Sequence, residues 1–454
     1  MLGTKAGKRA IGPRGKAAWV LFLTAWGMPG FAVPVDVRLV GPWQVRVVAP
    51  PTKPGEPAST ATLDIPGPTI VTVVDEKHDS LPTFRPGSPG WQRGARLRAL
   101  IAEECTTPDL LDPQSLVLRE APGPSARQFE RGKDYGADLR WGTIGRLAGG
   151  RIGEHQSVFA SYRHGLLRLD SIVQEASGRL VLRQGQPRAA APQPAPLEAG
   201  DRRLVNVWVA GRLERLTPDH LFPILEQEFP EGPKASPAPA ETFLPKTLAK
   251  LRAGQAVRML AWGDSVTVGT WLPEAQRWQY QFAARLKSRF PRSQIEVITE
   301  AWGGRNTASY LAEPPGSPHN YREKVLGVKP DLVVSEFVND AGLDPQQVEE
   351  RYSKLLADFQ ALGAEWIILT PHYVRPDWMG LSREREIDQD PRPYVAGLRQ
   401  FAARHGVALA DAAARYGRLW RQGIPYSTLM VNSINHPDAR GMKIFADSLM
   451  ALFP

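Results

Sequence analysis

Apolar positions in the C-terminal half of the chain follow two alternating patterns. Short apolar runs, each typical of a buried strand, are separated by longer stretches in which apolar residues return every three or four positions, as on one face of a helix. The predicted strands are 257–261, 295–298, 332–337, 366–369 and 407–410. The predicted helices are 271–290, 345–362, 382–405, 412–422 and 437–453. This alternation predicts an α/β fold over 248–454, with three α/β/α layers around a mainly parallel sheet of five strands.

The pattern between residues 33 and 228 is different, with short apolar or alternating runs separated by proline and glycine. Such runs predict strands at 37–40, 43–48, 69–74, 166–172, 180–182 and 204–209. The proline-rich pieces 49–57 and 186–196 predict loops, because proline cannot donate a hydrogen bond into a sheet. We therefore expect a separate β-rich accessory domain over 33–228, joined to the α/β domain by a semi-stiff, proline-rich linker at 229–247.

Two aromatic segments of the accessory region, 133–136 and 141–144, allow two interpretations. Their aromatic side chains could form a platform for carbohydrate. Aromatic residues more often pack inside a β core, which is the interpretation we favour. The sequence does not predict what the accessory domain binds.

Residues 1–32 have the pattern of an export signal. A positively charged stretch precedes the short apolar run 17–26, and small residues follow at 30–32, where cleavage is expected. The apolar run is too short for a stable membrane-spanning helix, so an uncleaved anchor is the less favoured alternative. We expect a Sec-type signal peptide, a mature protein that begins near Val33, and a secreted or periplasmic location.

Composition narrows the function classes. The formal net charge is +9, but the basic residues are spread along the chain without interleaved aromatics, which does not favour nucleic-acid binding. The single cysteine, Cys105, excludes an intramolecular disulfide framework and a multi-cysteine metal site. No His, Asp and Glu set has metal-ligand spacing, so we expect no metal and no cofactor.

A candidate nucleophile follows the first strand of the α/β domain. Gly263 breaks that strand, and Ser265 lies in the turn before the next helical stretch. Carboxyl ends of parallel strands and helix N-termini meet at one edge of such a sheet, where open α/β sheets carry their chemistry. The alternative role for Ser265 is that of a helix N-cap. A serine nucleophile would also need a base and donors for an oxyanion.

Three later segments offer those groups in order. They are Gly303-Gly304, then Asn339-Asp340, then His436. Together with Gly263-Asp264-Ser265, they resemble the four blocks of the SGNH (GDSL-type) hydrolases in the family's order. The resemblance covers about the last two hundred residues, by the usual size of one α/β domain. It implies an α/β/α hydrolase fold and a serine esterase activity.

The resemblance also implies a role for each matching residue. Ser265 is the nucleophile and His436 the general base. The oxyanion hole consists of the N–H groups of Ser265 and Gly304 and the side-chain amide of Asn339. Asp264 and Asp340 support these loops. For Asn339 the alternative is a structural turn at the strand end, which asparagine also favours.

One position departs from the family pattern. The family places aspartate three residues before the histidine, where this chain has Ser433. The histidine would then be oriented by Asn432, by a backbone acceptor near Ser433, or by a carboxylate from elsewhere, for which Asp411 at the end of the fifth strand is the candidate. His372, after the fourth strand, is the second candidate for the base.

The sequence thus predicts a secreted serine esterase that acts through an acyl-enzyme on a small-molecule or polysaccharide ester. Residues 304–310 resemble the corresponding segment of rhamnogalacturonan acetylesterase-like members, which points to O-acetylated carbohydrate. One alternative is a lipase or lysophospholipase with the same residues. Another, suggested by Ser433, is a catalytically decayed carbohydrate-binding protein. The oligomeric state is not predicted.

Overall fold

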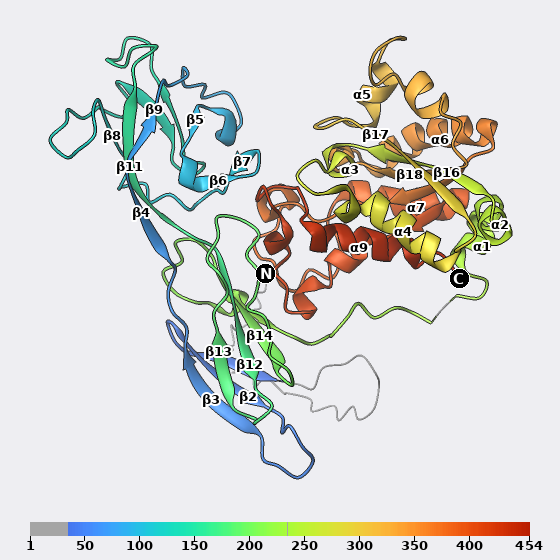
Figure 1. Ribbon diagram of the computed structural model, residues 1–454, viewed down its shortest axis with the longest axis horizontal. Coiled ribbons are helices and arrows are strands. Elements are labelled where there is room, and N and C mark those ends of the chain that lie inside the picture. The colour runs from blue at the N-terminus through green and yellow to red at the C-terminus, as the bar shows by residue number, and fades with distance from the viewer. Residues whose placement is uncertain (1–34, 234) are drawn as a thin grey trace, which may run out of the picture.

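The computed structural model describes residues 35–233 and 235–454, so the predicted export signal at 1–32 lies outside the described residues. The chain forms a β-rich N-terminal part and an α/β C-terminal part, which lie side by side (Figure 1). Within these ranges, none of the helices combines the length and the apolar character that crossing a membrane requires.

The C-terminal sheet has the predicted five parallel strands. They are β16 (Ala256–Gly263), β17 (Gln294–Ala301), β18 (Leu332–Glu336), β19 (Glu365–Leu369) and β20 (Ala408–Ala410). Their order is β17-β16-β18-β19-β20, and every pair is parallel. All five residues of the central strand β18 are buried, as expected for a strand covered on both faces.

Two pairs of helices cover this sheet. Helix α4 (Trp278–Arg289) packs against α9 (Ala439–Met450), and α6 (Pro345–Leu362) packs against α7 (Pro393–His405). The crossover after β16 leads to β17 and the crossover after β18 leads to β19, in opposite directions across the sheet. Because such crossovers are right-handed, α4 and α6 lie on opposite faces. The predicted three-layer architecture is confirmed.

The helix bounds agree with the prediction where the sequence contains recognisable capping residues at both ends of the helix. Helix α6 has the predicted range, with Asp344 as its N-cap and Gly363 in the left-handed conformation after its end. Four predicted helices are shorter than expected, among them α9, which covers 439–450 of the predicted 437–453. Helices α4 and α7 begin at residues 278 and 393, after prolines 273 and 391, and α8 (Ala412–Tyr416) stops before Gly417. A Cβ at Gly417 would lie 2.8 Å from the Tyr373 hydroxyl, so this glycine allows a close approach.

The second half of the predicted linker is helical. Helix α1 (Pro239–Phe243) lies within it, and α2 (Pro245–Ala253) begins there. Ala240, Leu244 and Leu248 are buried in the hydrophobic core of the C-terminal domain. These residues therefore belong structurally to the α/β domain, and the irregular connection is shorter than 229–247.

The N-terminal part is β-rich, as predicted, and contains two separate hydrophobic cores. In the first core, two sheets pack against each other. One sheet consists of β1 (Asp36–Gly41), β2 (Gln44–Ala49) and β3 (Ser59–Asp64), and the other consists of β12 (Arg168–Gln174), β13 (Leu180–Arg183), β14 (Arg202–Val209) and β15 (Leu221–Pro223). We call the second the distal lobe. Its strands are β4 (Ile70–His78), β5 (Ala95–Arg96), β6 (Ile101–Ala102), β7 (Cys105–Thr106), β8 (Val117–Arg119), β9 (Tyr135–Asp138), β10 (Thr143–Arg146) and β11 (Val158–Gly165).

The aromatic segments at 133–136 and 141–144 contribute strands β9 and β10, which pair with each other. Tyr135 is 3% exposed and packs in the core of the lobe, and Trp141 is 6% exposed and packs at the interface with the α/β domain, against Ile434. The packing interpretation holds for these two side chains.

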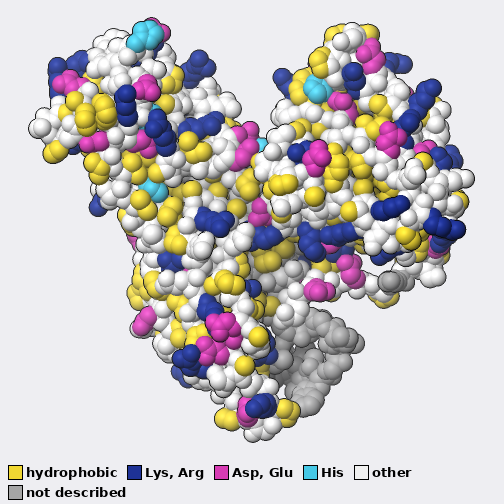
Figure 2. All heavy atoms as spheres, in the orientation of Figure 1, with side chains coloured by type: hydrophobic (Ala, Val, Ile, Leu, Met, Phe, Trp, Pro, Cys, Tyr) yellow, Lys and Arg dark blue, Asp and Glu magenta, His cyan; other side chains and the backbone are white. Residues whose placement is uncertain are grey.

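Several contacts join the N-terminal part to the α/β domain. Near β15, the Asn206 side-chain amide donates to the carbonyl of Gly423 at 2.7 Å, and Trp420 packs with Trp208 and Phe222. Further along, the β6–β7 hairpin of the distal lobe reaches residues 432–436. Figure 2 shows a deep notch between the distal lobe and the α/β domain on the viewed face.

Candidate active site

Ser265 lies at the carboxyl edge of the sheet, shortly after strand β16, which pairs with the central strand β18. It is the first residue of the short helix α3 (Ser265–Val268), and its N-cap is Asp264, whose Oδ1 accepts from the Val266 N–H at 3.1 Å. The N-cap role considered for Ser265 thus belongs to its neighbour. A Cβ at Gly263 would lie 2.4 Å from the Glu336 carbonyl oxygen, so only glycine fits where the strand turns toward the serine.

His436 meets Ser265, although 171 residues separate them: its Nε2 lies 3.1 Å from Ser265 Oγ. The loop that carries the imidazole is shaped by Asn432. The side-chain oxygen of Asn432 accepts from the N–H groups of Ile434, Asn435 and His436, each at 2.9 Å. The imidazole is 4% exposed, so it is held in one position at the edge of the site.

The other ring nitrogen of His436 contacts a carboxylate from the N-terminal part. Nδ1 lies 2.8 Å from Oε2 of Glu103, at the turn of the β6–β7 hairpin. With a proton on Nδ1 donated to Glu103, Nε2 is free to accept the hydroxyl proton of Ser265. This is the arrangement of a Ser–His–acid triad whose acid comes from another domain.

Glu103 is suited to remain ionised. Partial burial by itself raises the pKa of the Glu103 carboxyl. The hydrogen bonds from His436 and from the N–H of Glu104, together with nearby positive charges, lower this pKa by more than burial raises it. The pKa of Glu103 therefore lies below its ordinary value. Its side chain is 26% exposed. A carboxylate in this state can hold an imidazolium that forms during proton transfer.

The structure corrects the predictions for the orienting group. Asp411 forms an ion pair with Arg399 at 2.8 Å, accepts from Thr370, and caps α8 through the N–H of Ala414. Asn432 orders the loop backbone instead of binding the imidazole. Ser433 Oγ lies 2.7 Å from the hydroxyl oxygen of Thr107. Glu103, and none of these three residues, is the side chain that contacts Nδ1 of His436.

His436, and not the second candidate base His372, makes the hydrogen bond to Ser265. The ring of His372 is fully buried between Tyr416 and Phe445. Burial lowers the pKa of His372 to about 3, and the positive charge of Arg392 lowers it too. An imidazole held neutral and away from solvent does not suit a base that must exchange protons with substrate and water.

No sequence pattern pointed to Glu103, because it lies 333 residues from His436 in a region without a motif. A structural signal does mark it. Glu103 has φ of 51°, although it is not glycine, at a two-residue turn between short strands. Backbone strain of this kind is typical of functional sites and is maintained by surrounding contacts.

Those contacts fix the hairpin on the histidine loop. Besides the Thr107–Ser433 hydrogen bond, Cys105 and Trp141 pack against Ile434 in a small apolar cluster. Burial raises the pKa of the Cys105 thiol to about 12, so this cysteine remains a neutral packing residue. Hydrogen bonds and apolar contacts together place the acid against the imidazole.

The predicted oxyanion donors lie on loops that contact Ser265 or its neighbour Asp264. Gly303 lies against Ser265, since a Cβ added there would be 3.8 Å from the serine Cβ, and Gly304 follows with φ of 71°. Asn339 is held by Asp264, whose Oδ2 accepts from both its backbone N–H and its side-chain amide at 2.9 Å. One amide hydrogen of Asn339 is thus engaged, which leaves the second for an oxyanion.

Asp264 and Asp340 have the supporting positions that the resemblance implies. Complete burial raises the pKa of Asp264 to about 7, and the charge of Asp340 raises it as well. The hydrogen bonds from Asn339 and Val266 lower this pKa, but by less. Asp340 accepts from the Thr307 hydroxyl at 2.8 Å and from the Tyr352 hydroxyl at 3.2 Å. It therefore connects the end of β18 to the segment that follows Gly304.

A tryptophan that sequence reasoning did not single out completes the site. The ring of Trp271 stacks on the imidazole of His436, with 3.9 Å between ring centres and 5° between planes. Its indole N–H donates to the carbonyl of Pro437 at 2.8 Å. The imidazole is thus restrained by hydrogen bonds in its plane and by an aromatic face above it.

One group of possible metal ligands occurs among the described residues. Glu103, Glu104 and His436 each place one ligand atom within 4.8 Å of the others. Both ring nitrogens of His436 already have partners in Glu103 and Ser265, and Glu104 Oε1 lies 3.5 Å from Nε2. This geometry suits proton transfer, and the absence of a metal remains a prediction.

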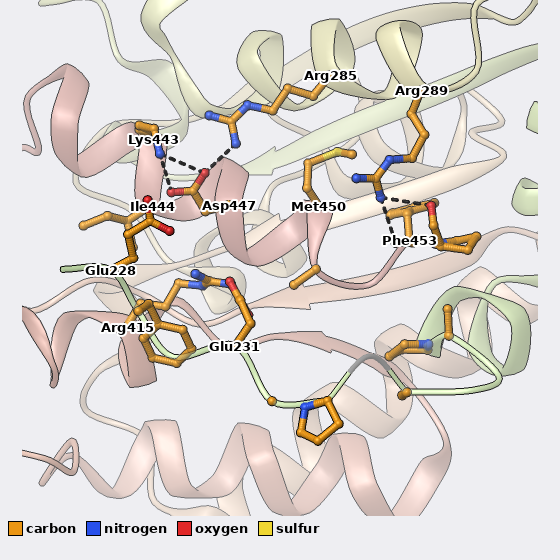
Figure 3. Close-up of a pocket in the computed structure, with 18 of the residues that line it drawn as sticks. Glu228, Glu231, Arg285, Arg289, Arg415, Lys443, Ile444, Asp447, Met450 and Phe453 are labelled. Atoms are coloured by element: carbon orange, nitrogen blue, oxygen red, sulfur yellow. Dashed lines mark hydrogen bonds and ion pairs between the residues drawn. The ribbon is translucent and has the colours of Figure 1, made fainter. Parts of the chain in front are cut away.

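A pocket of about 940 Å³ lies away from this site, between the connecting segment and helices α4 and α9. Figure 3 shows its charged side chains pairing with one another. Asp447 binds both Arg285 and Lys443, while Arg415 binds Glu231. Since these side chains are engaged with one another, we assign the pocket no chemistry.

Residues 261–444 match the family model of the GDSL-like lipase/acylhydrolases. Over this range the C-terminal domain is similar to that family. The matched range contains Ser265, Gly304, Asn339 and His436 but not Glu103. The chain therefore combines a GDSL-like domain with an additional β-rich region that lies outside the matched range.

Several solved structures resemble parts of the chain at low identity. A two-domain esterase (CEX) active on acetylated mannans is 16% identical, with a TM-score of 0.37, over 46% of this chain and 51% of that one. A mutant of Axe2, an acetyl-xylooligosaccharide esterase from Geobacillus Stearmophilus, is 18% identical, with a TM-score of 0.35, over 43% and 93%. The acetyl xylan esterase AlAXEase is 20% identical, with a TM-score of 0.33, over 42% and 97%.

The chain thus spans about half the length of the two-domain esterase. No curated protein matches the chain in sequence. Similarities this distant say nothing about the substrate of the GDSL-like domain.

Proposed function

We propose that this chain is a serine esterase whose catalytic centre consists of Ser265, His436 and Glu103. The observation that carries the proposal is the imidazole of His436, which is hydrogen-bonded on one side to a serine hydroxyl at 3.1 Å and on the other to a carboxylate at 2.8 Å. A serine is a weak nucleophile unless an oriented base removes its proton, and these two contacts meet that need.

In the proposed reaction, Ser265 Oγ attacks the ester carbonyl carbon while Nε2 of His436 takes the hydroxyl proton. Charge on the resulting oxyanion is stabilised by the N–H groups of Ser265 and Gly304 and by the amide of Asn339. The bond to the leaving oxygen then breaks, and His436 returns the proton to the departing alcohol. Water deprotonated by His436 attacks the acyl-enzyme, which releases the acid and restores Ser265.

The substrate class that we propose is an O-acetyl ester on carbohydrate, with the protein acting after export. The similarity of residues 304–310 to acetylesterase-like members supports the acetyl group, and the signal pattern of residues 1–32 supports a secreted or periplasmic location. Mass spectrometry of the exported protein would test cleavage near Val33. An N-terminus that still carries residues 1–32 would contradict the signal.

The direct test of the catalytic centre is covalent labelling. A fluorophosphonate probe should label the purified protein at Ser265 only, and Ser265→Ala and His436→Ala should lose both labelling and hydrolysis of p-nitrophenyl acetate. Circular dichroism and thermal melting should show that both variants remain folded. Labelling at another residue, or full activity in Ser265→Ala, would overturn the assignment.

The same assays distinguish the alternatives. A lipase or lysophospholipase would prefer long over short acyl p-nitrophenyl esters, whereas an acetylesterase would prefer acetate. A decayed binding protein would not react with the probe. The argument for decay was the missing acid at Ser433, and the contact between Glu103 and His436 removes that argument.

A further inference from the structure

An aromatic cluster crosses the interface between the distal lobe and the GDSL-like domain. Trp141 and Trp91 of the lobe have ring centres 4.8 Å apart, and Trp91 lies 5.9 Å from Trp378 of the C-terminal domain. The guanidinium of Arg375 lies over Trp141 at 4.7 Å and over Trp378 at 5.9 Å. Trp141 is buried, whereas Trp378 is 52% exposed. The cluster thus ends in an indole face open to solvent.

Charged side chains from both domains border this face. Arg140 of the lobe binds Asp377 of the C-terminal domain at 3.1 Å and Asp109 of the lobe at 3.2 Å. Arg375 also pairs with Asp377. Two guanidinium groups are balanced by two carboxylates, so the border has no excess charge, but it offers both donors and acceptors to a ligand.

The cluster is connected to the catalytic centre. A pocket of about 290 Å³ is lined by Asp377, the chain neighbour of Trp378, by Arg140 and Arg375, and also by Thr107 and Ser433, while Trp378 itself lies outside the lining. Thr107 belongs to the segment that carries Glu103, and Ser433 lies three residues before His436. The backbone N–H of Arg375 donates to the carbonyl of Ile434, in the loop that carries His436, at 2.8 Å. A ligand in this pocket therefore contacts both segments that form the His436–Glu103 pair.

We infer that Trp378, with Asp377 and Arg140 beside it, binds a neutral pyranose ring of the glycan that bears the ester. This inference rests on the proposed esterase function. A sugar ring presents C–H groups on its face and hydroxyls on its edge, which match an indole face bordered by carboxylate and guanidinium groups. A polyanionic glycan would find no excess positive charge, and an acyl chain would meet a charged border.

Kinetics with two kinds of ester test the inference. For Trp378→Ala, kcat/KM on an acetylated xylo- or manno-oligosaccharide should fall about fivefold to tenfold relative to kcat/KM on p-nitrophenyl acetate, mainly through KM. Trp378→Phe should recover most of the loss. Phe243→Ala, at a 40%-exposed aromatic residue in α1, is the matched control. It should leave unchanged both the ratio of the two kcat/KM values and the KM for the acetylated oligosaccharide. An unchanged ratio in Trp378→Ala would overturn the inference.

Binding measured without turnover separates this site from catalysis. Titration calorimetry of Ser265→Ala with xylohexaose, mannohexaose and cellohexaose should detect at least one ligand, and adding Trp378→Ala should weaken it by a similar factor. Binding without esterase activity in the wild type would end the proposed function but leave the sugar site standing. No binding by any of the three, or a Trp378→Ala effect confined to long acyl esters, would overturn the sugar site.

Discussion

Glu103 Oε2 lies 2.8 Å from Nδ1 of His436, so a carboxylate from the β-rich part orients the imidazole of the GDSL-like domain. The GDSL-like domain has Ser433 at the position where the family that it resembles carries the acid. Asp411, the carboxylate that the sequence suggested in its place, is paired with Arg399. The distal lobe therefore contributes a side chain to the proposed catalytic centre. Its position relative to the C-terminal domain should affect turnover.

Replacing Glu103 by glutamine should lower kcat for p-nitrophenyl acetate by on the order of a hundred- to ten-thousandfold, because an amide does not hold the imidazolium or fix its tautomer as a carboxylate does. The control is Glu130→Gln, which removes an exposed carboxylate of the same lobe and leaves the contact to Nδ1 in place. We expect that control to stay within about threefold of the wild type. Equal losses in the two variants would indicate a general charge effect and contradict the triad.

Replacing Asn339 by alanine should lower kcat about a hundredfold or more, since removing one oxyanion donor costs roughly 3 kcal/mol in the transition state. Its side-chain amide also donates to Asp264, so unfolding by urea must be measured alongside activity. A loss of kcat with an unchanged urea midpoint identifies the oxyanion role. If kcat fell only as far as folded protein was lost, Asn339 would be structural alone.

Trp271 should act as a positioning residue, because its ring stacks on His436 at 3.9 Å. Trp271→Ala should lower kcat about tenfold as the imidazole gains freedom to turn, and Trp271→Phe should restore most of that loss by keeping an aromatic face in place. The rate of fluorophosphonate labelling at Ser265 should follow kcat in both variants. A phenylalanine variant as impaired as the alanine variant would argue against stacking.

Acidic side chains beneath the nucleophile should make stability depend on pH. Burial, with a contribution from Asp264, raises the pKa of Glu336 well above its ordinary 4.5, while burial and Asp340 raise that of Asp264 to about 7. In each case the folded state binds the proton more tightly than the unfolded state. The resulting stability is fully present below the unfolded pKa and is lost as pH rises through the folded pKa.

We therefore expect the urea midpoint to fall between about pH 4.5 and pH 8, with a smaller fall in Glu336→Gln, which stays neutral throughout. Glu274→Gln, at an exposed position, is the matched control and should keep the wild-type slope. Parallel pH profiles in the wild type and Glu336→Gln would show that Glu336 does not bind its proton more tightly when folded.

Local sequence patterns predicted most of the α/β domain. Period-2 and period-3.6 apolar patterns reflect which side of a strand or helix is buried, so they located the five strands and the full range of α6. They were less accurate at helix starts near proline. They also did not show that the β-rich region contains two cores, since apolar runs do not say which sheets pack together.

By itself, the sequence determined the order of elements in the C-terminal domain and the positions of Ser265, Gly304, Asn339 and His436, because each follows a strand or lies in a motif that is local in the chain. Only the tertiary structure decided which carboxylate faces His436. That contact joins residues 333 positions apart and depends on how the β6–β7 hairpin docks on residues 432–436. Docking is decided by complementary packing and hydrogen bonds between distant segments, such as Cys105 with Ile434 and Thr107 with Ser433, which leave no periodic signal in either segment.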